Sequence, residues 1–351
     1  MGFAEYRKPV IPPDQARNEP DRGRQAEEPH QLPARGWLDI LSRTGNRISI
    51  DNITIVAAGV AFYAFVAVVP TLAAIIGIYG LVSDPSQVGQ QVTAFARILP
   101  REVLPVLEQQ LTRITSNTQA AGISALVGVL VALYGAASAT KALIQGLNIC
   151  YGEREKRGFI RLNLIALVLT FAIIAGALIA LALVAVLPAL LEHLSFGLAI
   201  DTLLSWARWP ILVGGFIFGL ALMYRYAPSR EDAKWSWVSW GATAAALLWV
   251  AGSALFSLYV AKFGSYDKTY GSLAAIVVFL MWLYLSAFAV LLGAELNSEM
   301  ERQTLKDTTE GPPKPMGERG AESADTVGPS RHSRGEDKDK ARPPSRQRRG
   351  P

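Results

Sequence analysis

Long apolar runs separated by short polar segments are the main pattern between residues 53 and 299 of the chain. A helix that crosses a bilayer needs about 20 mostly apolar residues. Six segments reach that length, and they are residues 53–82, 123–144, 164–191, 203–223, 238–260 and 273–294. The pattern predicts an all-α fold, a polytopic membrane bundle of about six transmembrane helices within residues 36–302.

The two ends of the chain differ from this core in composition. Residues 1–35 and 303–351 are dense in Pro, Gly and charged side chains. Such segments hold too little apolar surface to fold alone, which predicts a disordered N-terminal tail and a disordered, basic C-terminal tail. The Lys and Arg residues of 331–351 suit either contact with anionic lipid headgroups or a solvated tail.

The connection between the first two predicted spans carries a helical pattern of its own. Apolar residues recur at helical spacing over residues 88–98 and again over 103–114, on either side of Pro100. We expect two amphipathic helices outside the membrane. They would either lie in the headgroup region or cap an opening in the bundle.

Basic residues beside the spans predict the orientation of the bundle, because Lys and Arg gather on the cytoplasmic side. They precede the first span and fill the second-to-third and fourth-to-fifth connections, as Arg35, Arg43, Arg47, Arg154, Lys156, Arg157, Arg161, Arg225, Arg230 and Lys234. The connection at residues 192–202 has no Lys or Arg. Both termini are therefore predicted to be cytoplasmic.

Composition supports a membrane protein and restricts its chemistry. Apolar residues make up 51% of the chain and charged residues 18%, with a mean hydropathy of +0.26. That is more apolar than a soluble chain of this length needs for its core. A single cysteine, Cys150, excludes an internal disulfide and cannot build a metal site by itself.

Four segments carry a family resemblance. They are residues 58–80 (AGVAFYAFVAVVPTLAAIIGIYG), 133–153 (LYGAASATKALIQGLNICYGE), 207–228 (ARWPILVGGFIFGLALMYRYAP) and 255–299, where the turn FGSYDKTYGS precedes GAELN. Over residues 36–300 the chain resembles the YihY/BrkB family of bacterial inner-membrane proteins. The resemblance implies six spans and a place in the bacterial plasma membrane. It implies no settled activity, since members have been labelled both ribonuclease BN and virulence factor.

The ribonuclease label can be tested against the residues themselves. RNA hydrolysis needs metal-bound water or a general acid and base held together. The three histidines, His30, His193 and His332, lie in the tails and one connection, and carboxylates of the core are few, mainly Glu295 and Glu299. We therefore expect no catalytic site, metal or cofactor, and no specific nucleic-acid partner.

Polar residues on the second predicted span share one helix face, and they are Tyr134, Ser138, Lys141, Gln145 and Asn148. This stripe either lines a cavity or packs helices through hydrogen bonds. Glu295, in the sixth span, is expected at the depth of Lys141 and is a candidate ion-pair partner. Alternatively, both side chains extend toward the headgroups.

The turn between the last two spans is the most family-like segment, with Gly264, Ser265, Tyr266, Asp267, Thr269, Tyr270 and Gly271. It is either a tight turn that uses the conformational freedom of glycine or a binding loop. Few intramembrane charges favour passage of a small or lipid-like substrate through the bundle, with membrane lipids as partners. The alternative is a noncatalytic scaffold that binds lipid or a partner protein.

Overall fold

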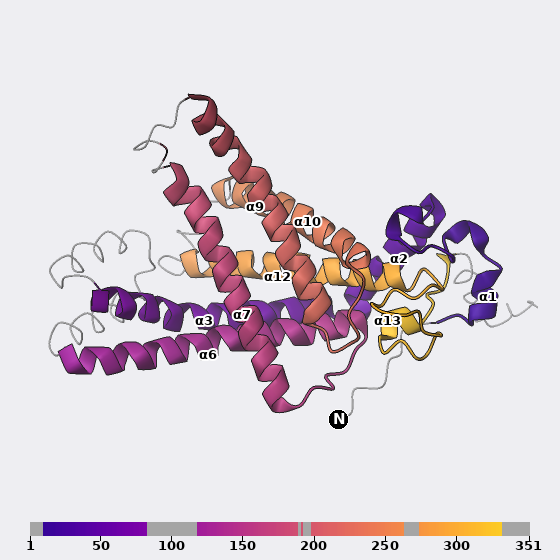
Figure 1. Ribbon diagram of the computed structural model, residues 1–351, viewed down its shortest axis with the longest axis horizontal. Coiled ribbons are helices and arrows are strands. Elements are labelled where there is room, and N and C mark those ends of the chain that lie inside the picture. Colours follow the sequence, from indigo (N-terminus) through magenta and orange to yellow (C-terminus); the bar gives the residue numbers. More distant parts are fainter. Residues whose placement is uncertain (1–9, 83–117, 189–190, 192–197, 263–273, 332–351) are drawn as a thin grey trace, which may run out of the picture.

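The computed structural model describes residues 10–82, 118–188, 191, 198–262 and 274–331 (Figure 1). Within these ranges all six predicted spans are helices: α3 (Ile53–Val82), α6 (Thr118–Tyr151), α7 (Phe159–Leu181), α9 (Leu198–Tyr226), α10 (Trp235–Lys262) and α12 (Ala274–Glu301). A π-helical segment, η3 (Ala182–Val186), follows α7. The predicted all-α membrane bundle is confirmed. The two amphipathic helices and the turn at residues 264–271 lie outside the described residues.

The number of membrane crossings depends on how the start of α3 is treated. Among the described residues, five helices are long and apolar enough to cross a membrane by themselves. A sixth crossing results if α2 (Ala34–Ile50) and the first part of α3 are taken together, although their axes differ by 64°. The bend falls at Asp51 and Asn52, and Asn52 has a positive φ of 51°.

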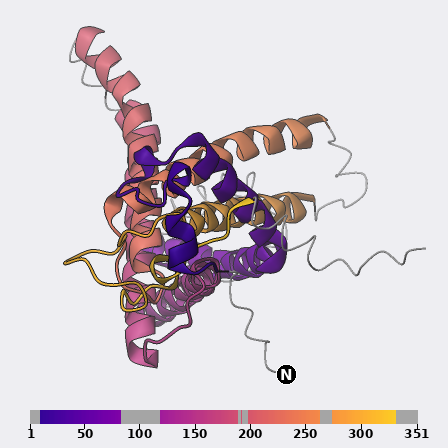
Figure 2. The same ribbon diagram turned by 90° about the vertical axis from the view of Figure 1, so that its right-hand side faces the viewer.

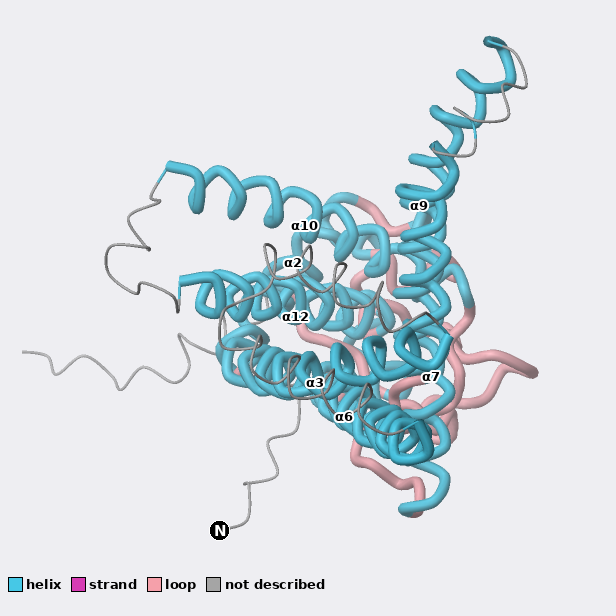
Figure 3. Tube along the Cα trace, turned by 90° about the vertical axis from the view of Figure 1, so that its left-hand side faces the viewer, coloured by secondary structure: helices cyan, strands magenta, loops and turns pink. Residues whose placement is uncertain are grey.

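Helices α3, α6 and α12 run side by side, while α7 and α9 diverge from them toward one end (Figures 1 and 3). The core packs small residues against large ones. Helices α10 and α12 cross closely, since a Cβ at Gly241 would overlap the carbonyl oxygen of Gly293. Asn297 locks that crossing, because its side chain accepts from the Gly241 N–H at 2.8 Å and donates to the Val238 carbonyl at 3.2 Å.

The segments predicted to be disordered tails are largely folded. Residues 10–50 and 302–331, which we call the terminal cap, lie together over the ends of the long helices (Figure 2). The cap contains the short helices α1 (Pro13–Arg17), η1 (Pro20–Arg22), η2 (Pro29–Gln31) and α13 (Glu322–Asp325). Residues 1–9 and 332–351 lie outside the described residues.

Paired charges explain why the prediction of disorder is wrong for residues 10–35 and 303–331. Arg24 is fully buried and donates to the carboxylate of Glu19 and to the carbonyls of Gln303 and Gly328. Thr304 in turn donates to the Ala26 carbonyl at 2.6 Å. Charged side chains can be buried when each has a partner, and composition alone does not reveal such pairing.

Candidate functional site

An apolar cavity of about 160 Å³ lies between α10 and α12, within their membrane-spanning segments. Its lining is Leu248, Trp249, Gly252, Ser253, Leu285, Phe288, Ala289 and Leu292. Gly252 leaves room in this wall, because no described atom beyond its own helical turn lies within 4 Å of the position its Cβ would take. Pockets for whole small molecules are commonly about 300–1,000 Å³. This cavity therefore suits a segment of an apolar chain.

Two reciprocal hydrogen bonds join α10 to α12 beside the cavity, and Trp249 and Ser253, one member of each bond, belong to its lining. Trp249 Nε1 donates to Ser286 Oγ at 2.9 Å, and Trp282 Nε1 donates to Ser253 Oγ at 3.3 Å. The two indole rings meet edge to face, with centroids 6.0 Å apart. Each indole N–H thus has a partner inside the protein, which an apolar environment requires. The wall consequently presents mainly carbon atoms to the cavity.

A short sequence repeat could have revealed this wall. Tryptophan and serine stand four residues apart on α10, at Trp249 and Ser253, and again on α12, at Trp282 and Ser286. On two antiparallel helices such a spacing places each tryptophan beside the other helix's serine. The sequence reasoning missed the repeat because neither half carries an ionisable group.

Helices α7 and α9 also present open apolar faces. No described atom lies within 4 Å of a Cβ built at Gly176 of α7, or at Gly214, Gly215 and Gly219 of α9. Trp206 and Phe218 of α9 are exposed. Figure 3 shows α9 leaving the neighbouring helices. Such faces suit contact with hydrocarbon, since helices satisfy their own backbone hydrogen bonds in lipid.

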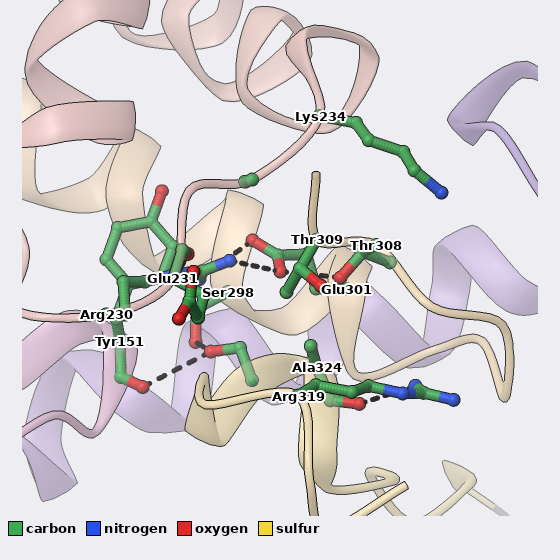
Figure 4. A network of polar contacts seen from close by, with 12 residues as sticks. Tyr151, Arg230, Glu231, Lys234, Ser298, Glu301, Thr308, Thr309, Arg319 and Ala324 are labelled. Carbon is green, nitrogen blue, oxygen red and sulfur yellow. Dashed lines mark hydrogen bonds and ion pairs between the residues drawn. The ribbon is translucent and has the colours of Figure 1, made fainter. Parts of the chain in front are cut away.

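The end of the bundle that carries the terminal cap is closed by buried ion pairs (Figure 4). Glu301, the last residue of α12, accepts two hydrogen bonds from Arg230, at 3.0 and 2.6 Å, and one from Thr308 at 2.8 Å. The Arg230 guanidinium also lies over the Tyr151 ring, 4.8 Å from its centroid. Burial acts to lower the pKa of Arg230, but the charge and hydrogen bonds of Glu301 outweigh it and raise that pKa.

A second buried cluster joins α2 to the end of α12. Glu299 accepts from Arg43 at 2.6 Å and from Arg302 at 2.9 Å, and Arg47 lies 3.5 Å from its carboxylate. Arg43 also donates to the Pro329 carbonyl at 3.2 Å. All four charged side chains are buried. Losing Glu299 would leave three buried guanidinium groups without the carboxylate they share, so this carboxylate helps to hold the cap in place.

The predicted polar stripe does not converge on a described cavity. Tyr134 is 72% exposed, and the Ser138 hydroxyl donates to the Tyr134 carbonyl of its own helix. Lys141 Nζ donates to Asn163 Oδ1 of α7 at 3.2 Å, and Gln145 is exposed. Asn148 is buried and binds two connections, donating to Glu155 and accepting from the Ser229 N–H. The described contacts of the stripe therefore pack helices and loops.

The expected equal depth of Lys141 and Glu295 is not what the helices show. Leu291 of α12 contacts α6 at two residues. The Cys150 thiol donates to the Leu291 carbonyl at 3.4 Å, and Gly146 lies against the Leu291 side chain. Both helices run in the same direction (Figure 1). With a rise of 1.5 Å per residue, Lys141 and Glu295 lie on opposite sides of that contact, about 16 Å apart along the helices. Glu295 is fully buried nearer the terminal cap.

In the ranges that the structure describes, no three His, Cys, Asp or Glu side chains gather as a metal site would require. The expectation of no nuclease chemistry stays a prediction, since nothing in the described residues tests it directly.

Long apolar helices, a cavity at membrane level and a polar cap at one end define an integral, multi-pass membrane protein. The chain belongs to the virulence factor BrkB family, whose family model matches residues 44–317. The resemblance drawn from the sequence is thereby confirmed.

Relatives bear descriptions of two kinds. YfkH of Bacillus subtilis (strain 168), described as ribonuclease-like, is 32% identical over 227 residues, which cover 60% of this chain and 82% of that protein. A UPF0761 membrane protein of Tolumonas auensis is 26% identical over 284 residues, which cover 76% of this chain and 86% of that protein. Another UPF0761 membrane protein, from Idiomarina loihiensis, is 39% identical over 103 residues, which cover 29% of this chain and 36% of that protein. No solved structure matches the chain.

Proposed function

We propose that this chain binds a lipid-like substrate in the α10–α12 cavity and moves it across a bacterial plasma membrane. The observation that carries the proposal is the apolar cavity itself, in which the polar atoms of the lining residues Trp249 and Ser253 are already bonded to α12. An acyl chain enters such a space from the bilayer without leaving an apolar environment. An ion or a sugar would lose its hydration there and find few partners among the lining residues.

The closed cap suits one end of a translocation path. We place that end in the cytoplasm, with both termini, because Arg43, Arg47 and Arg230 belong to it. Opening this end would separate the Arg230–Glu301 and Arg43–Glu299 pairs, each of which joins two segments far apart in the sequence. At the other end of the bundle the described helices already diverge, so opening that end does not require these ion pairs to separate. We therefore assign the described arrangement to a state closed toward the cytoplasm.

A noncatalytic scaffold that binds lipid or a partner protein is the second candidate. The observation that favours it is the polar stripe, because Lys141 bonds to Asn163 and Asn148 bonds to two loops. These contacts hold helices together and line no described cavity. A scaffold would bind lipid at the cavity without moving it between leaflets.

Lipid movement in reconstituted vesicles separates the two candidates. Fluorescent phospholipid in proteoliposomes should exchange between leaflets faster than in protein-free vesicles. Gly252→Leu fills the cavity wall and should abolish most of that exchange. Gly176→Leu places the same side chain in open space on α7 and serves as the matched control. Exchange at the protein-free rate with the natural chain would refute translocation and leave the scaffold.

A further inference from the structure

Helix α2 buries three of its four charged side chains and exposes its two leucines. Asp39, Arg43 and Arg47 are buried against the rest of the terminal cap, while Leu38 and Leu41 are each 55% exposed. A helix at a water-facing surface shows the opposite arrangement. The exposed leucines therefore indicate that the outer face of α2 lies in lipid.

The position of α2 agrees with the membrane surface. It joins the membrane helix α3 through a bend of 64°, so it leaves the bundle where the bundle ends. Trp37 of α2 packs against Trp240 of α10, with ring centroids 5.5 Å apart, and Trp240 is 46% exposed. Tryptophan prefers the boundary between headgroups and acyl chains. Leu38 and Leu41 consequently lie near that boundary.

A cavity of about 380 Å³ opens beside Leu38, lined also by the charged residues Arg22, Arg35, Asp39 and Arg331. The Asp39 carboxylate accepts from Arg22 Nη1 and from the Arg331 N–H, each at 2.7 Å. Both of its oxygens are thus engaged inside the protein.

The charge around the cavity is positive. Arg35, on the rim, is 70% exposed at its side chain and lies 2.5 Å from Asp21. The three guanidinium groups of the lining thus outnumber the two carboxylates, Asp39 and Asp21, that contact them. A guanidinium that already touches a carboxylate keeps further N–H donors for a second anion.

We propose that this cavity binds the phosphate of an anionic phospholipid, whose acyl chains lie along Leu38 and Leu41. Guanidinium groups suit phosphate because their paired N–H donors match its oxygens. The positive cavity favours an anionic headgroup over one that carries a quaternary ammonium. The site is separate from the α10–α12 cavity, and the inference does not depend on lipid translocation.

Lipid binding to the full chain in detergent, followed by native mass spectrometry, tests the site. Dioleoylphosphatidylglycerol should bind more tightly than dioleoylphosphatidylcholine. Arg35→Gln and Arg331→Gln should each weaken phosphatidylglycerol binding about three- to tenfold, because one basic side chain beside anionic lipid contributes about 1 kcal/mol, and leave phosphatidylcholine unchanged. Leu38→Asn should weaken binding of both lipids.

Arg17→Gln is the matched control, since Arg17 is 68% exposed and lies 3.5 Å from Asp14, outside the cavity. Equal weakening by Arg17→Gln, or unchanged binding in both cavity variants, would overturn the site. Displacement of phosphatidylglycerol by inorganic phosphate, with no effect of Leu38→Asn, would also overturn it in favour of a free anion. If Arg35→Gln also lowers the unfolding temperature, its lipid binding no longer reports on the site alone. Phosphatidylglycerol binding by Arg331→Gln then decides whether the site exists.

Discussion

Trp249 and Ser286 share a hydrogen bond of 2.9 Å that joins α10 to α12 beside the apolar cavity. Trp282 and Ser253 repeat the same contact in the opposite direction. Because the two bonds flank a pair of touching indole rings, they hold both the separation of the helices and the shape of the cavity wall.

Removing the acceptor of that bond should destabilise the bundle. Ser286→Ala leaves the Trp249 N–H without its partner in an apolar region, so we expect a loss of about 1–3 kcal/mol. Thermal unfolding in detergent measures it, with Ser257→Ala, at an exposed serine of α10, as the control. Trp249→Phe combined with Ser286→Ala should cost less than the sum of the single changes. Additive losses would mean that the bond contributes nothing.

The folded cap predicts a sharp limit for C-terminal truncation. A chain that ends at residue 335 retains the contacts of Arg24 with Gly328 and of Arg43 with Pro329, so its unfolding temperature should match the full chain. A chain that ends at Arg302 loses both contacts and should unfold at a clearly lower temperature. Equal unfolding temperatures for the two truncations would show that residues 303–331 do not stabilise the bundle.

Acid should weaken the connection between α6 and α7 through Glu155. Burial acts to raise the pKa of Glu155, but hydrogen bonds from Arg157 and Asn148 and the charge of Arg157 lower it from 4.5 to about 2. A lowered pKa stabilises the folded state above about pH 4.5, and that contribution disappears as the pH falls toward 2.

Unfolding temperatures measured between pH 5 and pH 3, an interval that begins above the unfolded pKa of 4.5 and ends below it, test this coupling. Glu155→Gln should make the decline over this interval shallower than in the natural chain. Glu318→Gln removes the same charge from an exposed position of the cap and should leave the slope unchanged. A slope that Glu155→Gln does not alter would exclude the carboxylate as the source.

Purified protein should not cleave RNA, with or without a divalent metal. The expectation rests on the scattered histidines, His30, His193 and His332, and on the few carboxylates of the core. A gel assay on a labelled RNA measures it. Cleavage that a single substitution within the bundle abolishes would show that the chain does contain a catalytic site.

Reporter fusions test the orientation of the bundle. Fusions after His193 and Tyr266 should report an external location, and fusions after Arg157 and Pro351 a cytoplasmic one, because basic residues gather on the cytoplasmic side. The final fusion is placed at Pro351 so that the terminal cap stays intact. A cytoplasmic signal at His193 would contradict the six-span order.

The helices of the bundle could be predicted from the sequence because each results from a contiguous run of apolar residues. The first predicted span, residues 53–82, coincides with α3, Ile53–Val82. A long apolar run can cross a bilayer only as a helix that satisfies its own backbone hydrogen bonds, and such a run is visible without any knowledge of its neighbours. The family resemblance had the same origin, in contiguous segments of the chain.

Partners distant in the sequence were decided only by the tertiary structure. Arg24 and Gly328 are 304 residues apart, yet their contact turns segments that composition assigns to two disordered tails into part of a folded cap. The same holds for Lys141, which bonds to Asn163 and lies far from the depth of Glu295. Whether a buried charge is tolerated depends on the partner that packing brings to it, and no local pattern contains that information.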